Sequence, residues 1–194
     1  MTLTIRPAES HEGGTVADLW NSASAWLRSK GQDQWQYPVR LAGIQAAIET
    51  RTCWLVEDDR HDARATVTLD TCADPRLWFP EDQPDRARYV HRLVVTRDVE
   101  LPDLGSAILD WASDFAARDG ALWLRLDAWT SNTRLHKYYL DRGFDLVRTS
   151  QEPDVRSGVL FERRAGFVLG LGPLLAVRET RDPSPPEIAD SRRA

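Results

Sequence analysis

The chain has 194 residues, of which 42% are hydrophobic and 28% are charged, a composition typical of a folded globular protein. This length suits a single domain, or a single domain with a tail. The formal net charge is −5, from 25 basic and 30 acidic residues, and the basic residues are scattered along the chain. Because duplex-binding domains are usually basic, we expect no nucleic-acid partner.

The sequence also predicts a cytoplasmic protein with no membrane partner. Residues 1–14 contain no apolar core of a signal peptide. The longest apolar run, residues 165–177, is interrupted by Gly170, Gly172 and Pro173 and is too short to span a bilayer. The two cysteines, Cys53 and Cys72, could pair or stay free, and the reduced state is the default for so few cysteines.

Hydrophobic periodicity predicts alternating strands and helices. For example, Leu104, Ile108, Trp111 and Phe115 recur at helical spacing before Gly120. In chain order, we predict a strand at 3–6, a helix at 15–29, a helix starting at Pro38, strands at 53–57 and 65–69 joined as a hairpin, a strand at 89–95, a helix from 104, a strand at 122–126, a helix from 132 to 143, and strands at 144–149 and 159–163.

This order predicts an α/β fold of the α+β type. The strand–helix–strand unit around residue 104 implies one parallel crossover, whereas the remaining connections are hairpin-like. We therefore expect a mixed, mostly antiparallel sheet flanked by helices. The domain is expected to cover residues 1–164. Residues 165–194 form a C-terminal extension that becomes rich in proline and charge, and we expect it to be disordered from about residue 178.

A thirteen-letter segment at residues 132–144, NTRLHKYYLDRGF, carries the clearest pattern in the chain. Gly143 as a helix stop and Phe144 as a core residue have purely structural explanations. The adjacent pair Tyr138 and Tyr139 is more informative. Neighbours on a helix point about 100° apart, so one tyrosine can be buried while the other faces a cleft.

This segment resembles the N-x-x-A-x-x-x-Y-x-x-x-G-F motif of the GNAT N-acyltransferase superfamily. The motif positions are occupied by Asn132, Leu135 (in place of alanine), Tyr139, Gly143 and Phe144. The preceding strand, residues 122–127, is also similar, and the resemblance covers roughly residues 2–163. It implies a GNAT-like fold and transfer of an acetyl, or other short acyl, group from acetyl-CoA to a primary amine of a small molecule or peptide.

The cofactor turn departs from the family pattern Q/R-x-x-G-x-G/A. The pattern falls on residues 100–105, where only Gly105 matches. Glu100 replaces the basic or amide residue, Asp103 replaces the middle glycine, and Pro102 has no N–H. Weak coenzyme A binding is therefore predicted. Two functions stay open: an acyltransferase, or a repurposed GNAT-fold binding protein with a degenerate site and no acetyltransferase activity.

The resemblance implies the following roles. Tyr139 is the general acid that protonates the leaving thiolate, and His91, which has a suitable intrinsic pKa, is the base for the amine. Each could instead be a structural residue. The backbone N–H groups near Leu93, Val94 and Val95 would stabilise the tetrahedral oxyanion. The remaining cofactor-binding residues are expected to be Leu104, Gly105, Ser106 and Asn132.

Tryptophans in predicted loops are the candidates for the acceptor pocket, namely Trp35, Trp78 and Trp129. The acid-rich loop at residues 70–85 could attract a cationic amine or could simply be solvated. The four histidines lack ligand-like spacing, so we expect no metal. The partner is then a small-molecule amine, and the protein a monomer or homodimer.

Overall fold

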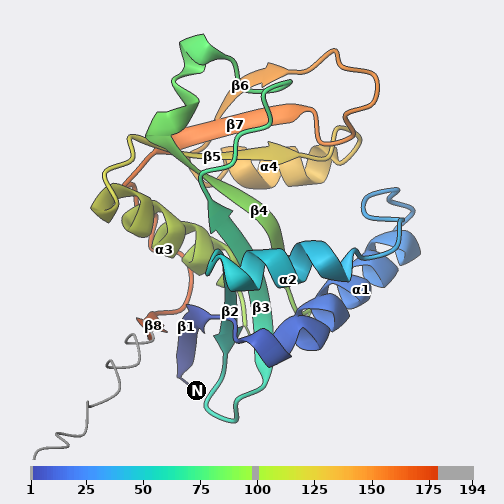
Figure 1. Ribbon diagram of the computed structural model, residues 1–194, viewed down its shortest axis with the longest axis vertical. Coiled ribbons are helices and arrows are strands. Elements are labelled where there is room, and N and C mark those ends of the chain that lie inside the picture. Colours follow the sequence, from blue (N-terminus) through green and yellow to red (C-terminus); the bar gives the residue numbers. More distant parts are fainter. Residues whose placement is uncertain (1, 98–100, 179–194) are drawn as a thin grey trace, which may run out of the picture.

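The alternating apolar pattern of the strands builds a single mixed sheet of eight strands in the computed structural model, which describes residues 2–97 and 101–178 (Figure 1). The strands lie in the order β6 (Asp145–Thr149), β7 (Val159–Arg164), β5 (Trp123–Ala128), β4 (Ala87–Val95), β3 (Ala63–Asp70), β2 (Cys53–Glu57), β1 (Leu3–Pro7) and β8 (Leu175–Val177). The pairs β4–β5 and β1–β8 are parallel and the others are antiparallel. The expected mixed, mostly antiparallel sheet is confirmed.

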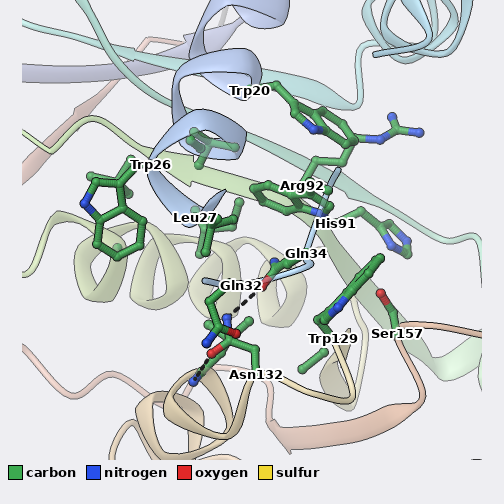
Figure 2. Close-up of a pocket in the computed structure, with 18 of the residues that line it drawn as sticks. Trp20, Trp26, Leu27, Gln32, Gln34, His91, Arg92, Trp129, Asn132 and Ser157 are labelled. Atoms are coloured by element: carbon green, nitrogen blue, oxygen red, sulfur yellow. Dashed lines mark hydrogen bonds between the residues drawn. The ribbon is translucent and has the colours of Figure 1, made fainter. Parts of the chain in front are cut away.

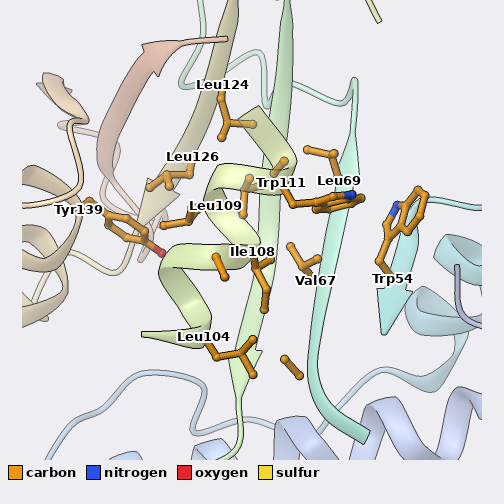
Figure 3. Close-up of a cluster of buried hydrophobic side chains, with 14 of the residues drawn as sticks. Trp54, Val67, Leu69, Leu104, Ile108, Leu109, Trp111, Leu124, Leu126 and Tyr139 are labelled. Atoms are coloured by element: carbon orange, nitrogen blue, oxygen red, sulfur yellow. The ribbon is translucent and has the colours of Figure 1, made fainter. Parts of the chain in front are cut away.

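Four α-helices flank the described sheet, with different helices on its two faces (Figure 1). Period-two alternation along β2 shows how: Cys53 and Leu55 pack with α1 and α2, whereas Trp54 and Val56 pack with α3. Figure 3 shows the second layer, where Ile108 and Trp111 of α3 lie against β3. The helices are α1 (Gly13–Ser29), α2 (Leu41–Glu49), α3 (Leu104–Arg118) and α4 (Thr133–Leu140), with short 3-10 turns at Ser10–Glu12, Pro80–Asp82 and Pro84–Arg86.

The second helix begins three positions later than the expected start at Pro38. Its N-cap is Arg40, which has an extended backbone and whose carbonyl accepts the N–H groups of Gly43 and Ile44. Residues 38–40 stay outside the helix because Val39 packs into the core beneath α1 and α2. The loop before it, residues 32–37, which we call the aromatic loop, packs against the same cluster through Trp35.

The folded core continues beyond Arg164, which corrects the expectation that it ends there. β8 adds a parallel strand to β1, and the N–H of Arg178 donates to the carbonyl of Ile5 at 2.9 Å. Leu175 of this strand packs against the main core. The expectation of disorder from about residue 178 concerns residues 179–194, which lie outside the described residues.

The segment between β7 and β8 is fastened to α3. The buried carboxylate of Asp110 accepts hydrogen bonds from the N–H groups of Leu169 and Gly170 at 3.1 and 2.8 Å. Gly172 lies so close to α3 that a Cβ atom there would be 2.6 Å from the carbonyl oxygen of Asp103. Only glycine fits this approach, so the segment and the start of α3 are packed as one unit.

Both cysteines are free thiols, Cys53 buried and Cys72 exposed. Among the helices of the described part of the chain, none has the length and apolar character that crossing a membrane requires.

Deleting residues 173–194 should lower the melting temperature by about 5–15 °C, because the deletion removes the hydrogen bonds along the edge of β1 and the core contact of Leu175. The matched control deletes residues 179–194, keeps β8, and should leave the melting temperature nearly unchanged. Calorimetry of both variants makes the comparison, and equal melting temperatures would show that β8 contributes nothing to stability.

Candidate active site

β4 carries an irregularity that separates it from β5. Thr66 of β3 pairs with Val94, but Thr68 pairs with His91, so β4 has one residue more than β3 over this stretch. Arg92 lies in the extra stretch with φ at +52°, and such a bulge bends its strand. Pairing with β5 extends only from Ala87 to Tyr89. Beyond Tyr89, the edge of β4 that faces β5 is left available for a ligand.

A cavity of about 1420 Å³ opens at this divergence (Figure 2). Its wall is formed by α1, the loop at residues 32–40, β4, the start of α3, and α4. Ten of the residues selected from the sequence meet in this wall: Trp35, His91, Leu93, Val94, Val95, Leu104, Gly105, Trp129, Asn132 and Tyr139.

Two other predicted site residues lie away from the cavity. Trp78 is buried in a separate cluster with Tyr89, and the guanidinium groups of Arg125 and Arg148 lie 4.6 and 6.0 Å from its ring centroid. The loop that carries it covers the sheet, so its tryptophan serves as core. Ser106 is also buried, and its N–H donates to the carbonyl of Asp103, so it offers no free N–H to a phosphate.

Four aromatic rings line one side of the cavity and form what we call the aromatic wall: Trp20, Trp35, Tyr37 and Trp129. Successive ring centroids are 5.1 Å apart for Trp20 and Trp35, 6.5 Å for Trp20 and Tyr37, and 6.4 Å for Tyr37 and Trp129. The indole N–H of Trp129 donates to Asp33 at 2.9 Å, which fixes the orientation of that ring. The wall suits a flat apolar group.

Tyr139 and Tyr138 both line the cavity, but Tyr139 is the more deeply buried. Tyr139 packs against Phe144 and Phe161, each with a centroid distance of 5.7 Å, and burial raises the pKa of its hydroxyl. The hydroxyl is therefore protonated at neutral pH. Figure 3 shows the ring of Tyr139 beside Leu109 and Leu126. The Tyr138 hydroxyl lies against Gly105, which has no room for a Cβ atom.

His91 sits between two aspartates from neighbouring strands. Its Nε2 is 3.3 Å from Asp70 Oδ1, and its Nδ1 is 3.9 Å from Asp127 Oδ1. Burial lowers the pKa of His91, but the hydrogen bond to Asp70 and the charges of both aspartates outweigh burial and raise it. Burial raises the pKa of Asp127, with His91 acting in the opposite direction. His91 and the two carboxylates thus form one charged cluster on the cavity wall, which we call the His91 cluster.

Asp127 is a site residue that the sequence reasoning missed. It stands near the end of β5, where that strand has left β4, and this position turns its carboxylate toward the cavity. The signal was available, because Asp127 ends the family-like strand segment at residues 122–127.

The cofactor turn keeps one acidic side chain at the start of α3. Asp103 is the N-cap and has φ at +57°, a conformation that favours glycine. Its Oδ1 accepts a hydrogen bond from Arg142 at 2.7 Å. Glu100 lies outside the described residues. The first N–H groups of a helix have no intrahelical acceptor, and here they belong to Leu104 and Gly105 on the cavity wall.

Asn132 has a structural role at the start of α4. Its Oδ1 accepts the N–H of Leu135 at 3.1 Å, and its amide donates to Gln34 at 2.7 Å (Figure 2). These bonds cap the helix and tie it to the aromatic loop. Across the described ranges, no group of three or more His, Cys, Asp or Glu side chains is arranged to hold a metal ion.

The comparisons with known proteins confirm the resemblance to the GNAT superfamily: the chain has the GNAT acetyltransferase fold. No family model matches it. It is 25% identical to YesJ of Bacillus subtilis (strain 168), an uncharacterized N-acetyltransferase, over 73% of this chain and 81% of YesJ. A GNAT-family acetyltransferase of Listeria monocytogenes matches with a TM-score of 0.71 and 21% identity, covering 84% of this chain and 94% of that one.

A second solved structure was determined with its cofactor. PaiA N-acetyltransferase of Thermoplasma acidophilum, in complex with coenzyme A, matches with a TM-score of 0.64 and 14% identity. The match covers 84% of this chain and 99% of PaiA. At 14% sequence identity, this similarity shows only that the two proteins share a fold.

Replacing Asp70 with asparagine should lower the pKa of His91. The substitution removes the hydrogen bond and the charge that raise this pKa and leaves burial, which lowers it. NMR titration of the imidazole protons measures the change, with the other histidines as internal references. Asp59→Asn on the exposed β2–β3 turn is the matched control and should leave His91 unchanged. An unchanged His91 pKa in Asp70→Asn would contradict the claim that Asp70 raises the pKa of His91.

Proposed function

We propose that this protein is an N-acyltransferase that moves an acetyl, or another short acyl, group from acyl-CoA to a primary amine of a small molecule or peptide. The observation that carries the proposal is the divergence of β4 from β5 at the Arg92 bulge, in a cavity that also holds Tyr139 and the His91 cluster. YesJ and the Listeria protein, named as acetyltransferases, and the coenzyme A-bound PaiA support it.

The free edge of β4 suits the donor. An extended arm with amide groups can hydrogen-bond to an unpaired strand edge. The N–H groups near Leu93, Val94 and Val95 would then face the thioester carbonyl and stabilise the negative charge that develops on its oxygen when the amine attacks. The phosphates would lie toward the start of α3, where Leu104 and Gly105 supply N–H groups.

Proton transfer would use the two sides of the same cavity. The acceptor arrives as an ammonium ion and must lose a proton, which the cluster of His91 and Asp127 receives. Tyr139, kept neutral by burial, would give its proton to the leaving thiolate. Because the His91 pKa is raised, the rate should increase as the pH rises through the pKa of the cluster.

Replacing Tyr139 with phenylalanine should lower kcat about 10²–10⁴-fold, as expected for loss of a positioned proton donor. The assay follows free thiol released from acetyl-CoA in the presence of a panel of primary amines. Tyr138→Phe on the same helix is the matched control and should have little effect. Damage by Tyr138→Phe with a silent Tyr139→Phe would overturn the assignment. Release of no thiol with any amine would contradict the proposed function.

The alternative function, a GNAT-fold binding protein without transferase activity, is favoured by the altered cofactor turn, in which Pro102 has no N–H and Asp103 carries a carboxylate. This carboxylate stands where the backbone should approach a pyrophosphate and could cost about 0.5–2 kcal/mol. The counter-charge of Arg142, 2.7 Å away, offsets part of that repulsion. The described part of the turn therefore fits coenzyme A, with weakened affinity.

Asp103→Gly should tighten coenzyme A binding by roughly 2- to 30-fold, because it removes this repulsion and relaxes the positive φ. Calorimetry with coenzyme A measures the change. Asp114→Asn, on the exposed face of α3, is the control. Equal or weaker binding by Asp103→Gly would show that the phosphates lie elsewhere.

A further inference from the structure

We propose that the acceptor is an amine that also carries a carboxylate and a flat apolar body, as in an amino acid with an aromatic side chain. This inference rests on the proposed function and names the substrate class of the same cavity. Three features carry it: two arginines that form no ion pair with any described residue, the His91 cluster beside them, and the aromatic wall.

The Arg92 bulge places opposite charges side by side. In a regular strand, consecutive side chains point to opposite faces of the sheet. Here the bulge breaks that alternation, and His91 and Arg92 both line the cavity (Figure 2). His91 brings Asp70 and Asp127 with it, so a cationic group of the acceptor is attracted to this cluster while an anionic group is attracted to Arg92. An α-amino acid carries such a pair of charged groups, an ammonium and a carboxylate, attached to one carbon atom.

A second arginine, Arg156, lies on the same wall and would form an anion-binding subsite together with Arg92. The Arg92 guanidinium lies 5.7 Å from the centroid of Trp20, and that of Arg156 lies 5.9 Å from the centroid of Trp129. Tyr37 lies between these two tryptophans in the aromatic wall. The two cations therefore flank Tyr37, whose hydroxyl can add a hydrogen bond to a carboxylate.

Within residues 2–97 and 101–178, neither Arg92 nor Arg156 forms an ion pair. By contrast, the nearby Arg76 is held by Asp74 at 2.6 Å. Unpaired guanidinium groups are suited to bidentate binding of a carboxylate. The charges of these two arginines would repel an amine that carries no carboxylate. The arginines also cover faces of Trp20 and Trp129 that a cationic ligand would need.

The test compares amino acids with the amines that remain when their carboxylate is removed: L-phenylalanine with phenethylamine, and L-tryptophan with tryptamine. Calorimetry without acetyl-CoA should show at least about tenfold tighter binding of the amino acid in each pair. Arg92→Gln and Arg156→Gln should each weaken amino acid binding about 10- to 100-fold, whereas amine binding should stay the same or become tighter because a repelling charge is removed. Arg60→Gln, on the exposed β2–β3 turn, is the matched control and should keep the preference.

Binding of phenethylamine as tight as that of phenylalanine, or a preference unchanged in both arginine variants, would overturn the inference. Because Arg92 is part of a strand, the exposed Arg156 provides the variant least able to disturb folding, and melting temperatures check both. Adding acetyl-CoA then separates the two proposals. If the amino acids bind as expected and no thiol is released, the acyltransferase proposal fails and the substrate class stands. If thiol is released with the amines and not the amino acids, the substrate class fails.

Discussion

The structure of the site depends on one extra residue in β4. The β3–β4 pairing requires a bulge around Arg92, and the bend that follows carries the second half of β4 away from β5. An unpaired strand edge inside a protein leaves N–H and C=O groups without partners, which is costly unless water or a ligand satisfies them. The same irregularity therefore opens the cavity and equips it to bind a molecule that carries amide groups.

The bulge also decides the electrostatics. By turning Arg92 into the cavity beside His91, it puts a cation next to a cluster with two carboxylates. The low dielectric of a partly buried site strengthens the interactions of His91 with Asp70 and with Asp127. The pKa of His91 therefore depends on which carboxylates face it. α4 closes the opposite wall and brings Tyr139, whose hydroxyl is kept neutral by its burial among phenylalanine rings. The proposed base and the proposed acid thus belong to different elements on either side of one opening.

Much of the fold could be predicted from sequence periodicity, because most strands alternate or run apolar and each of the longer helices has a clear stripe. β8 could not, since three residues in a proline-rich setting carry no period, and it is held by long-range contacts with β1 and α3. The start of α2 was misplaced because a proline is favoured early in a helix, and here tertiary packing of Val39 prevails. Trp78 shows the same limit, because a loop tryptophan can cover a sheet as well as line a pocket.

Residues that line the cavity could be selected from the sequence where a spaced motif existed, and were missed where only geometry brings them there. The motif at residues 132–144 led to Tyr139, and counting from Val95 led to the start of α3, and both line the cavity. Nothing in the sequence around Arg92 indicates a bulge. The position of Arg92 beside His91 in the cavity wall is therefore visible only in the structure.

The most direct test of the account is hydrogen exchange of the β4 backbone with and without saturating acetyl-CoA. The account predicts slower exchange at cavity-facing N–H groups among residues 93–95, and no change at residues 87–89, which are already paired with β5. Protection confined to other parts of the chain, with residues 93–95 unchanged at saturation, would contradict the claim that the free edge of β4 is the donor site.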